Sequence, residues 1–205
     1  MSAFPDPDER NPLAADCRRC PALAEARTCI SWGVGPLDAS LVVVGEAPAA
    51  GDPEADQWRG GNLTGMAYTN QVSGKKIRTL IADLGYAEDC YYTNSVKCFP
   101  PDGEGSNREP TPEESANCRP YLLREIEQVE PTAILPTGKH ATQSLFDAAG
   151  RELDGFLDTV LTRYDLDLGA PVIPLLHPAY QELWMARLDH TRESYLAAIA
   201  ESIRG

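Results

Sequence analysis

Short apolar runs alternate with helical patterns along most of the chain. Residues 41–44 form an apolar run that ends at Gly45, which is typical of a buried parallel strand. Residues 91–94, 132–136 and 171–176 are three further predicted strands. This alternation predicts an α/β fold, which we expect to be a three-layer α/β/α sandwich around a central, mostly parallel, four-stranded sheet.

The predicted helices between these strands have recognisable ends. Residues 75–84 carry apolar side chains at helical spacing and are followed by a glycine cap. Residues 111–129 begin with Thr at the N-cap, Pro at the first helical position and two Glu in the first turn. Further helices are predicted over residues 138–146 and 192–203.

The remaining segments are an N-terminal stretch and long loops. Residues 1–16 are polar and acidic, and we expect them to be a flexible lead-in to a single domain over residues 17–205. They do not resemble a signal peptide, and the longest apolar run, residues 195–200, is too short to cross a membrane. We therefore expect a cytoplasmic protein without membrane contact. The loop of residues 46–74 has the length of a functional loop.

Composition narrows the class of protein. The 205 residues are 42% hydrophobic, which is enough for a core and excludes global disorder. The net charge of −13 argues against a nucleic-acid partner, because nucleic acids are held mainly by Lys and Arg. The acids are dispersed and only 4 of the 18 basic residues are Lys. This pattern favours a halophilic host over an ordinary acidic protein.

Polar side chains follow the predicted strands. Glu46 and Ala47 come directly after the first strand, Asn94 ends the second, and His177 follows the fourth. Ligands of parallel α/β sheets bind beyond the carboxyl ends of the strands. The sequence therefore predicts one crevice that contains a carboxylate, a carboxamide and an imidazole.

The chain has six cysteines, of which four are candidate metal ligands. Cys17 and Cys20 form a CxxC pair, a spacing that places two thiolates on one metal centre. Cys98 and Cys118 enclose a Pro-rich loop and are candidates for the second pair. Four thiolates suit zinc or an iron–sulfur cluster. The other two cysteines are expected to be small buried apolar residues, Cys29 and Cys90.

Five sequence segments follow one another in a fixed order. They are Cys17-x-x-Cys20, residues 41–48 (LVVVGEAP), residues 93–101 (TNSVKCFPP), residues 107–114 (NREPTPEE) leading to Cys118, and residues 177–180 (HPAY). As a set they closely resemble the iron–sulfur, family 4 type uracil-DNA glycosylases, over residues 17–185. The resemblance implies a doubly wound α/β/α fold and cleavage of the N-glycosidic bond of uracil in DNA, which leaves an abasic site.

The resemblance also implies a [4Fe–4S] cluster, with zinc as the alternative, on four ligands: Cys17, Cys20, Cys98 and Cys118. The implied partner is uracil-containing DNA, and we expect a monomer. From the acidic composition we further expect the chain to be a halophilic archaeal member of this family.

The chemistry of uracil excision suggests a role for each residue in the crevice. Asn94 can pair with uracil O4 and N3–H, because a carboxamide both donates and accepts hydrogen bonds. Backbone groups of Glu46 and Ala47 can add contacts. His177 can stabilise negative charge on uracil O2, and Glu46 can orient water or stabilise the sugar cation. The alternatives are a turn cap for Asn94, a structural loop role for His177 and a helix-dipole role for Glu46.

Two positions depart from the family pattern. A Phe that stacks on uracil is usual in this family, and Leu63 stands in its place. Tyr68 offers the nearest aromatic ring, so we expect Tyr68 to stack on the base, with Leu63 as the second choice. Ala47 stands where another branch has a catalytic Asp, which leaves Glu46 as the best carboxylate. Competing hypotheses are a non-catalytic, metal-stapled DNA- or base-binding module and a glycosylase for another deaminated base.

Overall fold

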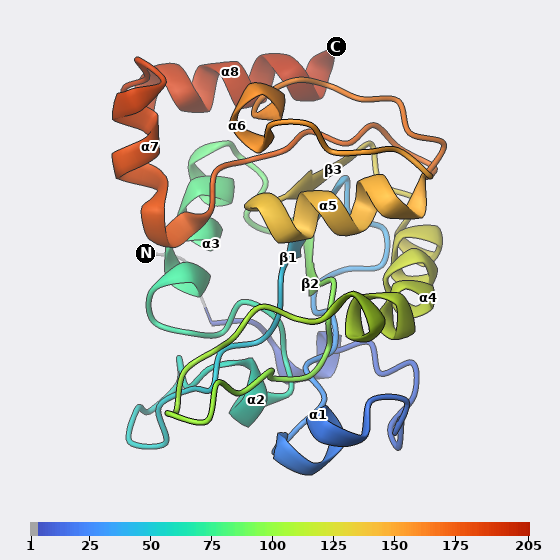
Figure 1. Ribbon diagram of the computed structural model, residues 1–205. Coiled ribbons are helices and arrows are strands. Elements are labelled where there is room, and N and C mark those ends of the chain that lie inside the picture. The colour runs from blue at the N-terminus through green and yellow to red at the C-terminus, as the bar shows by residue number, and fades with distance from the viewer. Residues whose placement is uncertain (1–3) are drawn as a thin grey trace.

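The computed structural model describes residues 4–205 and contains one parallel sheet. Strand β1 (Leu41–Gly45) lies between β2 (Cys90–Asn94) and β3 (Ala133–Pro136), and pairs in parallel with both. Figure 1 shows the three strands in the middle of the molecule with helices around them. The mixed α/β fold with a parallel sheet is confirmed. The first three residues of the predicted lead-in lie outside the described residues.

Helices fill most of the chain between and after the strands. Their bounds are η1 Pro7–Glu9, α1 Pro21–Ala26, α2 Gly61–Thr64, α3 Ser73–Asp83, α4 Pro112–Val129, α5 Lys139–Ala148, α6 Phe156–Thr159, η2 Pro178–Tyr180, α7 Gln181–Arg187 and α8 Arg192–Arg204. The start of α4 is as predicted, with a capping box between Thr111 and Glu114. The short helices α1, α2, α6 and α7 were not predicted from the sequence.

The predicted fourth strand is wrong, and the sheet has three strands in the part of the chain that the structure describes. Residues 171–176 do run beside β3 in parallel, with isolated bridges at Val172 and Leu175. Backbone hydrogen bonds join the two segments on either side of Pro136. Pro136 itself has no N–H to donate, so the ladder is interrupted there.

Side chains from the two faces of the sheet enter separate hydrophobic clusters. Leu41 and Val43 pack with residues of α3, α7 and α8, whereas Val42 and Val44 pack with residues of α4 and α5. All five residues of β1 are buried. The two clusters therefore hold the strand ends in fixed positions. No helix within residues 4–205 is long and apolar enough to cross a membrane.

Candidate active site

The carboxyl ends of the strands open into one cavity of about 370 Å³. Five of the six side chains predicted for substrate binding line it: Glu46, Ala47, Tyr68, Asn94 and His177. Leu63 is not among the lining residues, and its side chain lies beside Gly51 instead. The structure thus brings together the residues that follow separate strands in the sequence.

The end of β1 is tightly packed against its neighbours. A Cβ at Gly45 would lie 2.4 Å from Asn94 Oδ1 and 2.8 Å from Tyr68 Oη, so this position requires glycine. The Ser95 hydroxyl donates hydrogen bonds to the carbonyl oxygens of Gly45 and Glu46, at 2.9 and 3.0 Å. The backbone of Glu46 and the carboxamide of Asn94 are therefore fixed relative to each other.

Asn94 has a polar atom without a partner. The residue is 3% exposed, and its Nδ2 has no hydrogen-bond partner within the described residues. A buried polar group without a partner costs about 1–3 kcal/mol. Because Asn94 lines the cavity, a ligand with an acceptor oxygen can remove this cost.

The ring of His177 is held in one orientation. Its Nδ1 accepts a hydrogen bond of 3.2 Å from the Ala179 N–H, and the ring packs against Gly138. Burial, and secondarily the nearby His140, lower the pKa of His177. The neutral imidazole must then carry its proton on Nε2, because Nδ1 is the acceptor. His177 is thereby a neutral hydrogen-bond donor at the cavity.

Glu46 belongs to a cluster that the sequence analysis missed. Burial raises the pKa of Glu46, with His140 lowering it and Glu109 raising it further. His140 Nε2 lies 3.0 Å from Glu109 Oε1. Asn107 donates a hydrogen bond of 2.9 Å to the Pro48 carbonyl, which ties the loop before α4 to the cavity. The one available signal was that His140 comes two residues after the predicted strand-end glycine.

Tyr68 is held by contacts at its hydroxyl, its ring and its backbone carbonyl. Its hydroxyl forms a 2.6 Å hydrogen bond with Thr137, and its ring meets Tyr92 edge-on at 6.0 Å. Its backbone has a positive φ of 53°, and Arg78 donates a 3.1 Å hydrogen bond to its carbonyl. Burial raises the pKa of Tyr68, so the hydroxyl stays protonated. The ring forms part of a rigid wall of the cavity.

A second cavity of about 440 Å³ adjoins the first and shares three lining residues with it: Glu46, Asn107 and His177. Its walls include the aromatic rings of Phe156, Tyr180 and Trp184, the basic side chains of Arg108 and Lys139, and the acidic side chain of Glu109. The site is therefore open on one side to a groove lined by apolar, basic and acidic side chains.

The four candidate ligand cysteines lie close to one another and are unpaired. Cys98 and Cys118 share a small hydrophobic cluster with Leu23, against which Cys20 packs. Burial raises the pKa of Cys98, and Cys17 and Cys20 raise it further. The other two cysteines lie elsewhere, Cys90 in the core of the sheet and Cys29 beside Leu63.

Three hydrogen-bond donors reach the sulfur atoms of this group. Arg27 donates to Cys98 Sγ at 3.3 Å, Asn117 to Cys20 Sγ at 3.5 Å and Tyr121 to Cys17 Sγ at 3.4 Å. Such donors stabilise metal-bound thiolates.

Within residues 4–205, no group of three or more His, Cys, Asp or Glu side chains is arranged to hold a metal ion. Zinc bonds each thiolate at about 2.3 Å and so needs a tight set of sulfurs. Four thiolates are a ligand set that suits either zinc or an iron–sulfur cluster.

Comparison with known proteins agrees with this geometry. Residues 32–202 match the model of the uracil DNA glycosylase superfamily. The chain belongs to this superfamily. The type-4 uracil-DNA glycosylase of Archaeoglobus fulgidus is 33% identical over 189 residues, which cover 90% of this chain and 87% of that protein. The type-4 enzyme of Thermotoga maritima is 36% identical over 80% of this chain and 77% of its own length.

A type-5 uracil-DNA glycosylase, from Pyrobaculum aerophilum, is also similar. It is 31% identical over 170 residues, which cover 69% of this chain and 70% of that protein. The superfamily match begins after Cys17 and Cys20, whereas it contains the cavity residues from Glu46 to His177. The family assignment therefore rests on the sheet and its cavity.

Proposed function

We propose that this protein is a uracil-DNA glycosylase that hydrolyses the N-glycosidic bond of uracil in DNA and leaves an abasic site for repair. The observation that carries the proposal is the unpartnered Nδ2 of Asn94, in a cavity that also contains His177 and Glu46. Uracil offers O4 as an acceptor and N3–H as a donor, and a carboxamide can pair with both. The base reaches such a cavity by rotating out of the DNA stack.

His177 and Glu46 are proposed to act on the two charges that bond cleavage creates. Negative charge develops on uracil O2, and the Nε2–H of a neutral His177 can donate a hydrogen bond to it. Positive charge develops on the sugar, and an ionised Glu46 can stabilise it or orient the attacking water. Removing one such electrostatic contact typically costs about 10²–10³ in rate.

Tyr68 is proposed as the ring that stacks on uracil, because it lines the cavity and its position is fixed by Thr137 and Arg78. Leu63 stays the second choice. The backbone groups of Glu46 and Ala47 are proposed to make further contacts with the base.

We propose that Cys17, Cys20, Cys98 and Cys118 hold a [4Fe–4S] cluster, with zinc as the alternative. When bound, the cluster would join residues 17–20 to the segment from Cys98 to Cys118, as a structural connection. The proximity of the four thiols and the donors to their sulfurs support this proposal.

The domain organisation, the location and the host of the protein are also proposals. Two separate clusters on the two faces of β1 support three-layer α/β/α packing over a single domain of residues 17–205. That residues 1–16 form a flexible lead-in stays a prediction. We propose a cytoplasmic, monomeric enzyme from a halophilic host, whose partner is uracil-containing DNA.

A single-stranded oligonucleotide with one uracil tests the proposed function. The protein should release the base, so that alkali cuts the strand at that position, and a matched strand with cytosine should stay intact. Binding without release would support a non-catalytic module instead. Release of another deaminated base from a matched strand that carries it, without release of uracil, would indicate a different glycosylase.

A further inference from the structure

A buried ion pair lies directly behind the end of β2. Lys97 and Glu125 are 1% and 0% exposed, and Lys97 Nζ lies 2.5 Å from Glu125 Oε2. Lys97 comes from the loop after β2, whereas Glu125 comes from the C-terminal half of α4. Neither residue lines the uracil cavity, so the proposed reaction does not use them directly.

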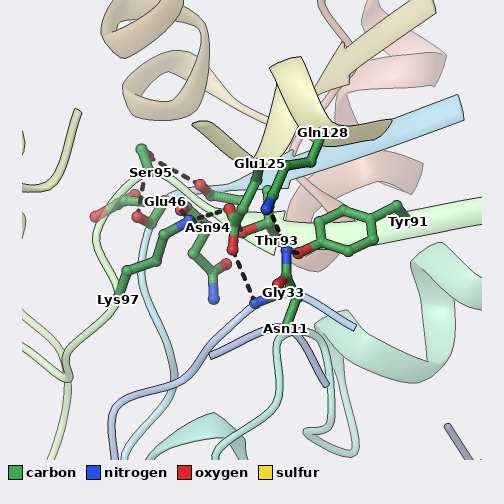
Figure 2. A network of polar contacts seen from close by, with 11 residues as sticks. Asn11, Gly33, Glu46, Tyr91, Thr93, Asn94, Ser95, Lys97, Glu125 and Gln128 are labelled. Carbon is green, nitrogen blue, oxygen red and sulfur yellow. Dashed lines mark hydrogen bonds and ion pairs between the residues drawn. The ribbon is translucent and has the colours of Figure 1, made fainter. Parts of the chain in front are cut away.

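Most hydrogen bonds of this pair involve Thr93 and Asn94 at the strand end (Figure 2). Lys97 Nζ also donates to Thr93 Oγ1 at 2.7 Å and to the Asn94 carbonyl at 2.6 Å. Glu125 accepts from the Thr93 hydroxyl at 2.6 Å and from the Gly33 N–H at 3.1 Å. The ammonium group therefore has three partners, and each oxygen of the carboxylate has at least one.

Stability alone does not explain such a pair. Removing two charges from water costs several kcal/mol for each ion, and apolar replacements of a buried pair are often neutral or stabilising. The contact that an apolar pair cannot supply is the hydrogen bond from Lys97 to the Asn94 carbonyl. That bond fixes the peptide of the residue whose carboxamide faces the cavity.

We propose that Lys97 and Glu125 are a positioning pair that holds the Asn94 peptide so that its carboxamide meets the uracil ring in the productive orientation. This inference rests on the proposed function. Lys97 immediately precedes Cys98, and its carbonyl accepts a 2.7 Å hydrogen bond from the Ser31 N–H. The pair therefore joins the cysteine-bearing loop to the recognition residue.

The expected effect is large because catalysis is sensitive to position. A displacement of about 1 Å at a reacting group can cost about 10²-fold in rate. Lys97→Met should therefore lower kcat/KM for uracil release by about 10-fold to 100-fold. The double variant Lys97→Met/Glu125→Gln should recover thermal stability, because it leaves no unpaired buried charge. It should not recover the rate, because the bond to Asn94 is still missing.

The deciding experiment measures kcat/KM for uracil release in Lys97→Met, in Asn94→Ala and in the two combined. If Lys97 acts through Asn94, Lys97→Met should have no further effect once the carboxamide is gone. The positioning role would be overturned if the effects of Lys97→Met and Asn94→Ala on kcat/KM multiply in the combined variant. It would also be overturned if the double Lys97/Glu125 variant recovers wild-type activity. Iron content and Tm are measured for each variant.

Glu127→Gln is the matched control for Glu125→Gln, because Glu127 lies on the same helix in an exposed ion pair with Arg124. It should leave both Tm and kcat/KM unchanged. Wild-type protein that releases no uracil would contradict the proposed function itself. Active wild-type protein with multiplying effects would contradict only the positioning pair.

Discussion

At the scale of single residues, the cavity contains polar groups whose buried state in the folded chain is energetically unfavourable. Asn94 Nδ2 is buried without a partner, and burial raises the pKa of Glu46, which means that its ionised form is disfavoured. Folding alone would not retain such groups, since each costs free energy. Both costs decrease when a ligand supplies an acceptor oxygen or a positive charge, as a uracil nucleotide undergoing cleavage does.

Asn94→Asp tests the role of the unpartnered nitrogen. The substitution keeps the size of the side chain but replaces the donating nitrogen with an acceptor oxygen. We expect kcat/KM for uracil release to fall about 10²-fold to 10³-fold, as for other electrostatic contacts at reacting groups. The measurement is single-turnover release of uracil from an oligonucleotide. A rate within about threefold of the wild type would contradict the role of Asn94.

The neighbours of Glu46 predict the pH dependence of the rate. Glu46 should become protonated as the pH falls through its raised pKa, so the rate should decrease toward acidic pH. His140→Gln removes the group that lowers the pKa of Glu46, and the acidic limb should move to higher pH. Glu109→Gln removes a group that raises it, and the limb should move to lower pH.

Profiles of kcat/KM against pH for the two variants check this prediction, because kcat/KM reports the pKa values of the free enzyme. Shifts in opposite directions support an ionised Glu46 as the group behind the acidic limb. If the acidic limb of the pH profile stays in place in both variants, or persists in Glu46→Gln, a group other than Glu46 causes it.

The sequence predicted Glu46, Asn94 and His177 for a simple geometric reason. Each follows a segment that runs in the same direction through the core, so their positions meet at one edge. Glu109 and His140 could not be placed in this way. Glu109 reaches the groove beside the cavity only because the loop before α4 folds back toward it, and that path depends on tertiary contacts such as Asn107 to Pro48.

At the scale of elements, local signals succeeded where one segment determines its own structure. The N-cap Thr111, followed by Pro112 and two Glu, predicted the start of α4, and the apolar run predicted β1. The prediction of a strand over residues 171–176 was wrong because the pairing of a strand depends on its partner. The missing N–H is on Pro136 of β3, and no pattern within residues 171–176 reveals it.

The cysteine group connects elements that are distant in sequence, and two substitutions test it. Cys98→Ala should give protein without iron and with a lower Tm, because a proposed ligand is lost. Cys90→Ala is the matched control, since Cys90 is buried in the core of the sheet and should leave the iron content unchanged. Iron, zinc and Tm are measured on anaerobically purified protein. Stoichiometric zinc without iron would contradict the cluster.

At the scale of the whole molecule, the net charge of −13 no longer argues against a DNA partner. Net charge describes the entire surface, whereas DNA contacts only part of it, and the groove beside the cavity contains Arg108 and Lys139 together with Glu109. One of the four lysines, Lys97, is buried and cannot contact phosphate. Binding must therefore rely on the flipped base and backbone groups more than on a wide basic surface.

The salt dependence of the activity follows from this distribution of charge. Proteins that hold DNA through many phosphate contacts lose affinity steeply as the salt concentration rises. With few such contacts, and with the halophilic host proposed above, uracil release should survive or require molar salt. A salt series of kcat/KM on one oligonucleotide checks this. Strong inhibition by moderate salt would contradict our interpretation of the acidic surface.

The central claim is that the cavity at the strand ends excises uracil from DNA. The most direct measurement is the amount of free uracil that iron-replete protein releases from a single-uracil oligonucleotide, with Asn94→Asp and His177→Ala proteins alongside. We predict stoichiometric uracil, an abasic site in the strand, and rates at least about 10²-fold lower in both variants. No free base from the wild type, or equal release by all three proteins, would contradict the account.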